Sequence, residues 1–238
     1  MLHSSGVSHE DDFRCFRKLA RTTPKACLVD IGANTGQSAI SFLANCPNGK
    51  VMSFEPNKLY EPVLEAVQSI LGKNRFSYFF FGLSDSDSSM DLYIPCVDGT
   101  PYMQESSITL DQFEKPWVKE RLNQYGQRLE IASISCDFKV GDEVIADPAL
   151  IDIIDIIKID AEGAEMKVLL GLTKVIEKYK PALLIENNDY HSVTPFLKKL
   201  GYEDFKYNST TDILEPMSGA TTNCFYLIQD KHLELLEA

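Results

Sequence analysis

Residues 27–43 read CLVDIGANTGQSAISFL, an apolar run that ends in an acid and is followed by two closely spaced glycines. Glycines let the backbone approach a ligand without interference from a Cβ atom, and the helix that follows presents free N–H groups. The segment therefore predicts a nucleotide-type binding site. The residues assigned to this site are Asp30, Gly32, Ala33, Asn34 and Gly36.

The turn differs from the dinucleotide fingerprint G-x-G-x-x-G, because Asn34 stands where the middle glycine is expected. The carboxylate of Asp30 repels a pyrophosphate but attracts a cationic sulfonium or amino group. A Walker lysine is missing, since Gln37 and Ser38 follow Gly36. The pattern favours S-adenosyl-L-methionine over NAD, and an NAD-dependent oxidoreductase is the alternative in another enzyme class.

A second acid, Glu55, ends the apolar run 51–54 and lies 19 residues after Gly36. A carboxylate at this place hydrogen-bonds the ribose diol of an adenosine cofactor. Pro56 and Asn57 follow directly and are assigned to the same cofactor site.

The third apolar run, residues 76–83, is followed by Ser84 and Asp85. We expect the Asp85 carboxylate to accept a hydrogen bond from the adenine amino group, with Ser84 beside it. The alternative is that Asp85 only forms a turn within the Ser-Asp-Ser-Asp run.

Residues 156–165, IIKIDAEGAE, place three acids around a glycine at a strand-to-helix turn. In a doubly wound sheet, such a turn lies next to the switch point where ligands bind. We expect Asp160 and Glu162 to line the reaction centre, as a general base or as electrostatic partners of the sulfonium, and Asp160 also to contact the cofactor. Glu165 suits the first turn of the helix, where a carboxylate interacts favourably with the dipole.

The fifth apolar run is followed by Glu186 and His191, on the same edge of the predicted sheet. Histidine is the natural general base near neutral pH, so His191 is a third candidate for this role. The alternative is that His191 is a surface or structural residue.

Five short apolar runs alternate with helical patterns and must position these side chains. The runs are residues 26–31, 51–54, 76–83, 153–159 and 182–185. Runs that are apolar at consecutive positions are typical of strands buried on both faces of a parallel sheet. The alternation predicts right-handed βαβ crossovers and a doubly wound α/β sheet with helices on both faces.

The C-terminal half contains further element signals. Apolar spacing over residues 166–176 predicts one helix, and Thr194 with Pro195 predicts the start of another. The runs 204–207 and 223–228 have no helical pattern between them, so we expect them to pair as an antiparallel hairpin.

The 238 residues fit a single domain, residues 1–238, because no linker or repeat divides them. An N-terminal helical segment is expected at residues 1–24, and an insertion at residues 86–150 interrupts the strand–helix alternation. The insertion carries a small strand at 90–94 and a helix opened by Pro116. It is interpreted as a lid over the substrate or as a surface excursion.

The chain has 23 basic and 35 acidic residues and a net charge of −12, which repels phosphate backbones. No nucleic-acid partner is therefore expected. No run is suited to cross a membrane and the N-terminus lacks a signal pattern, so we expect no membrane partner and a cytoplasmic location. The six cysteines lack metal-ligand spacing, which predicts reduced thiols and no metal site.

Four segments together resemble the FkbM family of class I S-adenosylmethionine-dependent methyltransferases. They are VDIGANTG at 29–36, FEPN at 54–57, LSD at 83–85 and IKIDAEGAE at 157–165. The resemblance covers about residues 25–190. It implies a Rossmann-like seven-stranded sheet, mostly parallel with an antiparallel C-terminal strand, and O-methylation of a hydroxyl on a sugar, polysaccharide or natural product.

The acceptor implied by the resemblance is a small molecule or a carbohydrate. The chain departs from the family pattern at Ser135-Cys-Asp137 and at residues 111–130, both where the acceptor is met. We expect an in-line displacement with Asp160 or Glu162 as the first candidate for the base. An N-methyltransferase acting on a small molecule or sugar and a non-catalytic S-adenosylmethionine-binding scaffold are the alternatives.

Overall fold

The computed structural model describes residues 11–146, 153–217, 219 and 221–236. The strands are β1 (Cys27–Ile31), β2 (Lys50–Phe54), β3 (Phe76–Phe79), β4 (Gly82–Ser84), β5 (Ser88–Val97), β6 (Thr100–Pro101), β7 (Leu129–Val140), β8 (Ile156–Ile159), β9 (Ala182–Glu186), β10 (Glu203–Asn208), β11 (Ile213–Pro216) and β12 (Asn223–Leu227). The α-helices are α1 (Phe16–Thr22), α2 (Gln37–Asn45), α3 (Glu61–Leu71), α4 (Pro116–Asn123), α5 (Gly141–Ile145), α6 (Glu165–Gly171), α7 (Thr173–Tyr179), α8 (Tyr190–Lys199) and α9 (Leu233–Leu236). Short 3-10 helices are η1 (Asp11–Cys15), η2 (Lys58–Tyr60), η3 (Met103–Glu105) and η4 (Leu110–Glu114). None of the helices in these residues has the length and hydropathy that a membrane span requires.

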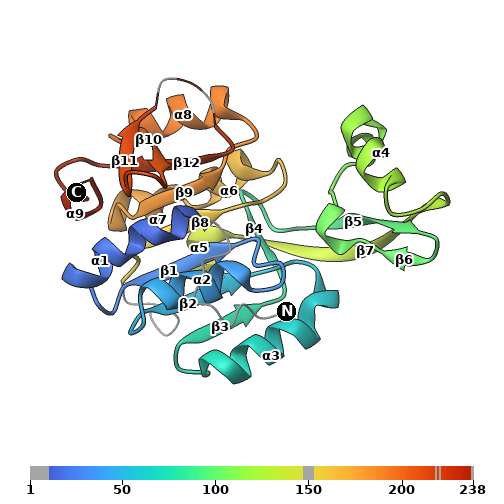
Figure 1. The fold of residues 1–238 in the computed structure, drawn as a ribbon, viewed down its shortest axis with the longest axis horizontal. Helices are drawn as coiled ribbons and strands as arrows, with labels where there is room; N and C mark the ends of the chain where they lie inside the picture. Colours follow the sequence, from blue (N-terminus) through green and yellow to red (C-terminus); the bar gives the residue numbers. More distant parts are fainter. Residues whose placement is uncertain (1–10, 147–152, 218, 220, 237–238) are drawn as a thin grey trace.

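The main sheet has eight strands in the order β11-β10-β12-β9-β8-β1-β2-β3 (Figure 1). The five strands from β9 to β3 are parallel, and β12 is antiparallel to both of its neighbours. The α/β class is confirmed, but the prediction of seven strands is wrong. An eighth strand, β11, pairs with β10 at the edge of the sheet. Its last residue is Pro216, which has no N–H to donate to a neighbouring strand and is therefore tolerated at an edge.

Helices cover both faces of the main sheet, as predicted. On one face, Leu28 and Ile156 belong to a core shared with α1, α2, α3 and α9. On the other face, Val29 and Ile157 pack with α5, α6, α7 and α8. Because successive strand residues point to opposite faces, a sheet buried on both sides needs apolar residues at consecutive positions.

Three expected elements differ in extent. The run 76–83 leaves the main sheet after β3 and continues as β4 in a second sheet, where a Cβ on Gly82 would lie 2.4 Å from the Phe138 ring. The pattern at 166–176 forms two helices, α6 and α7. Helix α8 begins earlier than predicted, because Asp189 accepts a hydrogen bond from the Ser192 N–H and caps it.

The predicted pairing near the C-terminus is confirmed in part. Strands β10 and β12 are antiparallel neighbours. They do not form a simple hairpin, because the chain between them adds β11 on the far side of β10. Leu214 of β11 is buried in the same core as Leu28, which explains why this short strand is retained at the edge.

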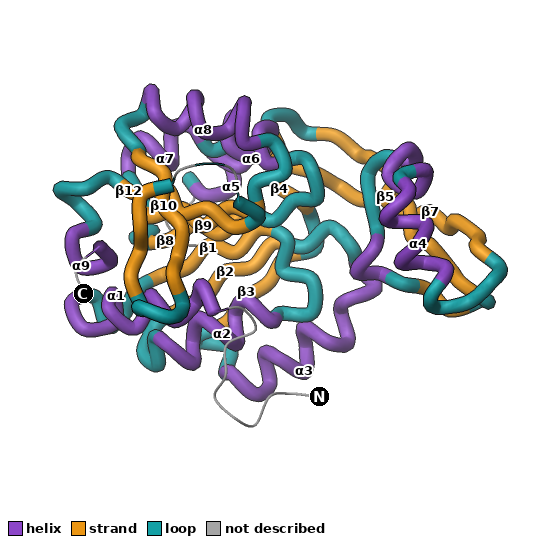
Figure 2. Tube along the Cα trace, turned by 45° about the horizontal axis from the view of Figure 1, so that its top comes forward, coloured by secondary structure: helices purple, strands orange, loops and turns teal. Residues whose placement is uncertain are grey.

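A second sheet, in the order β4-β7-β5-β6, extends from one end of the main sheet. We call residues 88–140 the arm, and Figures 1 and 2 both show it projecting away from the helices that cover the main sheet. The helix opened by Pro116 is confirmed as α4, and the small predicted strand is the longer β5. Val118 and Leu122 of α4 pack on Val97 and Phe113, so the arm has its own small core.

Candidate functional site

The strands β2, β1, β8 and β9 end side by side, and polar residues follow one face of these ends. The register places Asp30 opposite Ser53 on one side and opposite Lys158 on the other. Residues two apart in a strand share a face, so Asp160 lies just beyond Lys158 on the same side. This polar row lies at the carboxyl edge of the parallel strands, where open α/β sheets bind ligands.

Lys158 is at the centre of this row and is a residue that the sequence analysis did not single out. It is 7% exposed. Its ammonium lies 3.6 Å from an Asp30 oxygen and 3.2 Å from an Asp160 oxygen, and it donates to the Gly32 carbonyl at 3.3 Å. A buried ammonium requires such partners. In the sequence, the feature that could have pointed to Lys158 is its position inside the apolar run IIKI.

Asp30 is fully buried beneath the pocket and is not part of its lining. The Ser53 hydroxyl donates to it at 2.8 Å. Burial raises the pKa of the Asp30 carboxyl, and the Lys158 ammonium and the Ser53 hydrogen bond oppose this effect. Asp30 is therefore connected to the loop through Lys158, whose ammonium also donates to the Gly32 carbonyl.

The glycine-rich turn depends on left-handed backbone conformations. Gly32 has φ +83° and Gly36 has φ +77°, and Asn34 between them has φ +48°. Asparagine tolerates this region better than most residues, so it can occupy the place of the missing middle glycine. A Cβ on Gly32 would lie 1.8 Å from the backbone oxygen of Asp160, which means that only glycine lets these two loops approach.

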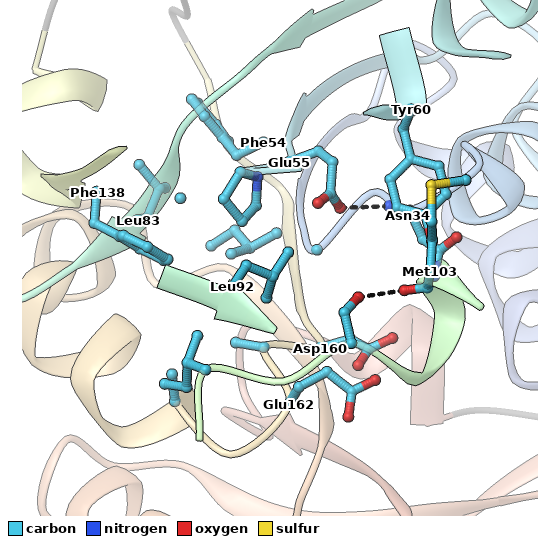
Figure 3. A pocket seen from close by; sticks show the side chains of 18 of the residues that line it. Asn34, Phe54, Glu55, Tyr60, Leu83, Leu92, Met103, Phe138, Asp160 and Glu162 are labelled. Atoms are coloured by element: carbon cyan, nitrogen blue, oxygen red, sulfur yellow. Dashed lines mark hydrogen bonds between the residues drawn. The ribbon is translucent and has the colours of Figure 1, made fainter. Parts of the chain in front are cut away.

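Glu55 joins two loops of the site. Its carboxylate accepts a hydrogen bond from the backbone N–H of Asn34 at 2.8 Å (Figure 3). It accepts another from the backbone N–H of Asn57 at 2.9 Å. Burial raises the pKa of Glu55 to about 7, although these two hydrogen bonds oppose the shift. Each carboxylate oxygen has a further lone pair, so the group can still accept a ligand hydroxyl.

Three carboxyl groups gather at the ends of β8 and β9. Asp160 and Glu162 line the pocket (Figure 3), and Glu162 has a left-handed φ of +50°. Desolvation and then the charge of Asp160 raise the pKa of Glu162 to about 7. The same two causes raise the pKa of Glu186, which follows on the neighbouring strand, to about 8. One or more of these groups can therefore hold or release a proton near neutral pH.

The pocket has an empty volume of about 780 Å³, including solvent at its mouth. Its wall combines the strand ends with residues of the arm. The lining residues are Ile31, Gly32, Asn34, Phe54, Glu55, Pro56, Tyr60, Gly82, Leu83, Leu92, Met103, Gln104, Ser106, Ile108, Phe138, Asp160, Ala161, Glu162 and Ala164. Sequence reasoning missed the arm residues and Tyr60, because no local pattern connects them to the glycine-rich turn.

The predicted site residues separate into two groups. Those in the pocket lining are Gly32, Asn34, Glu55, Pro56, Asp160 and Glu162. Those outside the lining are Asp30, Ala33, Gly36, Asn57, Ser84, Asp85 and His191. Asp85 and His191 are exposed, and Ser84 donates a hydrogen bond to Asp85 at 3.2 Å. Their predicted roles remain predictions.

The chemistry of the pocket fits an adenosine-type ligand with hydroxyl and ammonium donors. Its lining includes three carboxyl groups that can accept hydrogen bonds, Glu55, Asp160 and Glu162, together with the Asn34 amide. Within the described residues, the buried side-chain oxygen of Asn34 has no hydrogen-bond partner. A buried acceptor without a hydrogen bond raises the free energy of the folded protein, and a ligand donor would remove this cost. The apolar side chains on the opposite wall, such as Phe138, suit a flat heteroaromatic ring.

Comparison with known proteins adds a family match. The profile described as the methyltransferase FkbM domain matches residues 30–203. The chain is 26% identical over 167 residues to the AMB antimetabolite synthetase AmbE of Pseudomonas aeruginosa, covering 63% of this chain and 8% of that protein. It is 25% identical over 155 residues to the 2-O-methyltransferase NoeI of Sinorhizobium fredii, covering 65% of this chain and 60% of that protein. The matches thus span less than two thirds of either curated relative.

Two solved structures have a similar fold. The crystal structure of methyltransferase FkbM from Methylobacillus flagellatus gives a TM-score of 0.54 at 17% identity, over 85% of this chain and 43% of that chain. A putative caffeoyl-CoA O-methyltransferase from Staphylococcus aureus gives 0.50 at 11% identity, over 92% and 83% of the two chains. At these identities the similarity concerns the fold alone.

Proposed function

The chain belongs to the FkbM methyltransferase family, and from this premise we propose that it transfers the methyl group of S-adenosyl-L-methionine to a hydroxyl of a sugar, polysaccharide or natural product. The observation that carries the proposal is the convergence of the glycine-rich turn, Glu55 and the Asp160–Glu162 pair on one pocket. The similarity to NoeI, a 2-O-methyltransferase, supports oxygen as the accepting atom.

In this proposal, side chains that accept hydrogen bonds hold the cofactor. Glu55 accepts the ribose hydroxyls with the lone pairs that its two backbone hydrogen bonds leave free. Asn34 offers its unpartnered side-chain oxygen, and Asp160 offers a carboxylate to the amino group. When bound, the cofactor supplies an activated methyl group on a cationic sulfur. The surrounding carboxylates favour that positive charge.

Glu162 is the proposed base, which takes the proton of the substrate hydroxyl that is methylated. A pKa of about 7 suits a base that works near neutral pH. As the hydroxyl oxygen forms its bond to the methyl carbon, the carbon–sulfur bond breaks and Glu162 takes the hydroxyl proton. The products are a methyl ether and S-adenosylhomocysteine. Holding the reacting atoms in line can supply about 7–11 kcal/mol of the barrier reduction.

Thermal unfolding tests the cofactor part of the proposal. The protein is heated alone, with S-adenosylhomocysteine and with NAD. A ligand at about 100 times its Kd adds about 2.7 kcal/mol, which for this size raises Tm by about 5–10 °C. We expect this shift with S-adenosylhomocysteine only. A shift with NAD alone, or no shift with either ligand, contradicts the proposal.

Glu162→Gln tests the assignment of the base. Turnover with a labelled methyl donor is expected to fall by about 10²–10⁴-fold, while the affinity for S-adenosylhomocysteine changes little. Glu177→Gln, at an exposed position of α7, is the matched control and should keep normal turnover. Normal turnover of Glu162→Gln would show that another group takes the proton.

A further inference from the structure

We propose that the arm carries a second binding surface beside the pocket, which holds a neutral carbohydrate acceptor of two or more sugar rings. This surface, the aromatic row, consists of Trp117, Arg121 and Tyr125. The inference rests on the proposed function, because it concerns the acceptor of the same reaction.

The three side chains follow one side of α4 and the turn after it. Their spacing of four residues places successive members next to each other on a helix. The guanidinium of Arg121 lies 5.2 Å from the centroid of the Trp117 ring. Val118 and Leu122 take the buried side of the helix. The row is therefore left on the outside of the arm, where Trp117 is 52% and Tyr125 is 45% exposed.

The aromatic row is continuous with the pocket wall through the segment at residues 102–106. The ring of Tyr125 stacks on Tyr102 with centroids 4.2 Å apart and an angle of 13° between the planes. Arg121 forms a salt bridge of 2.5 Å with Glu105. Met103, between these two contact points, lines the pocket. A ligand that extends from the pocket past this segment therefore reaches the row.

The ion pair of Arg121 and Glu105 also acts on the candidate base. Glu105 raises the pKa of Glu162 and Arg121 lowers it, and both effects are smaller than those of desolvation and of Asp160. Glu105 lies between two residues that line the pocket, Gln104 and Ser106. This relationship supports a path from the reacting atoms to the row.

The composition of the row suits sugar rings. The exposed faces of Trp117 and Tyr125 are flat and apolar and can cover the C–H faces of a sugar. The neighbouring guanidinium and carboxylate of Arg121 and Glu105 provide donors and acceptors for hydroxyl groups. Trp117 and Tyr125 are exposed aromatic side chains that flank Arg121, an arrangement that fits an interaction site.

The charges of the arm favour a ligand without negative charge. Each basic residue of the arm already has a partner. The ion pairs are Lys119 with Glu114 at 2.6 Å, Arg121 with Glu105 at 2.5 Å and Arg128 with Glu130 at 2.6 Å. The other two contacts are Lys115 with Gln112 at 2.5 Å and Lys139 with the Phe81 ring at 4.3 Å. Since the pocket itself holds several carboxylates, an anionic acceptor would be repelled.

The protein contains a single tryptophan, Trp117, so its fluorescence reports on the row directly. The chain is titrated with cellopentaose, maltopentaose, mannopentaose and chitopentaose, with glucose as a single-ring probe and with pentagalacturonate as an anionic probe. We expect a saturable change with at least one neutral pentasaccharide and an affinity at least tenfold higher than for glucose or pentagalacturonate. No response to any neutral pentasaccharide, or equal binding of the anionic probe, overturns the inference.

Variants separate binding from folding. Tyr125→Ala is expected to weaken pentasaccharide binding at least tenfold, and Tyr125→Phe, which keeps the stacked ring, is expected to retain it. Leu110→Ala is the matched control, because Leu110 is an arm residue that is 52% exposed, like Trp117, and lies outside the row. An equal loss of binding in Leu110→Ala and Tyr125→Ala contradicts a role for the row.

The cofactor titration distinguishes the two proposals. A Tm shift with S-adenosylhomocysteine without any pentasaccharide response overturns the aromatic row and leaves the methyl-transfer proposal intact. A pentasaccharide response without a shift by S-adenosylhomocysteine overturns methyl transfer, and with it the role of the row in holding an acceptor.

Discussion

The ammonium of Lys158 lies 3.2 Å from the carboxylate of Asp160, and the same group is 3.6 Å from Asp30. It also donates to the Gly32 carbonyl. One buried side chain thus connects the end of β1 with the end of β8. Because Lys158 and Asp30 are almost completely buried, loss of the Lys158 charge leaves the Asp30 carboxylate without its cationic partner.

Lys158→Met is expected to destabilise the protein by about 3–5 kcal/mol, because it leaves the Asp30 charge buried without its partner. Urea denaturation of the ligand-free protein measures this loss. The double variant Lys158→Met with Asp30→Asn should lose less than the sum of the two single variants, since the unpaired charge is then absent. Additive losses would indicate that the two groups do not interact.

Gly32→Ala is expected to damage the site more than Gly72→Ala. Both glycines have a left-handed backbone, with φ +83° at Gly32 and +90° at Gly72, so both substitutions carry similar backbone strain. Only at Gly32 does the new Cβ collide with the Asp160 backbone, whereas nothing lies within 4 Å at Gly72. We expect about 1–2 kcal/mol of destabilisation for Gly72→Ala and a larger loss for Gly32→Ala. Urea denaturation of both variants measures the difference.

Glu55→Gln is expected to weaken S-adenosylhomocysteine binding by about 10–100-fold, because hydrogen bonds to a charged acceptor are worth about 1.5–3 kcal/mol. Calorimetric titration between pH 6 and 8 provides a second readout. Since ribose donors favour the ionised carboxylate, the wild-type affinity should rise as the pH passes the Glu55 pKa of about 7. The Gln variant should lose this dependence, and a dependence that persists would assign it to another group.

The carboxyls near the pocket should make the ligand-free protein less stable at alkaline pH. In the folded state the pKa of Glu186 is raised from 4.5 to about 8. Its contribution to the free energy of unfolding is therefore fully present below pH 4.5 and is lost as the pH rises through 8. Glu186→Gln should flatten the fall measured by urea denaturation between pH 5 and 9. An unchanged slope would show that Glu186 is not perturbed.

His232 should act with the opposite sign at acidic pH. Its Nδ1 accepts from the Ile228 N–H at 2.9 Å, and burial lowers the pKa of the ring to about 4. The contribution of a neutral buried histidine is present above pH 6.5 and is lost as the pH falls through 4. His232→Asn, whose side-chain oxygen can take over the hydrogen bond, should lose stability less steeply below pH 6. Denaturation curves at pH 4, 5 and 7 measure this slope.

The positions of several side chains at strand ends could be predicted from the sequence. Asp160, Glu162 and Glu55 could be placed near the glycine-rich turn because the carboxyl ends of parallel strands share one edge of a sheet. Asp85 was predicted in the same way but is exposed, since the chain leaves the main sheet after β3 and β4 joins β7. The shared-edge argument does not extend to a strand in another sheet.

The sequence by itself determined the family, the α/β class and the segments that converge on the pocket, because these depend on local motifs and on the alternation of strands and helices. Only the tertiary structure decided the pairing of Lys158 and the two hydrogen bonds of Glu55, because they depend on strand register. It also decided the arm side of the pocket and the edge strand β11. Those features arise from packing between segments that are distant in the chain, for which the sequence has no local pattern.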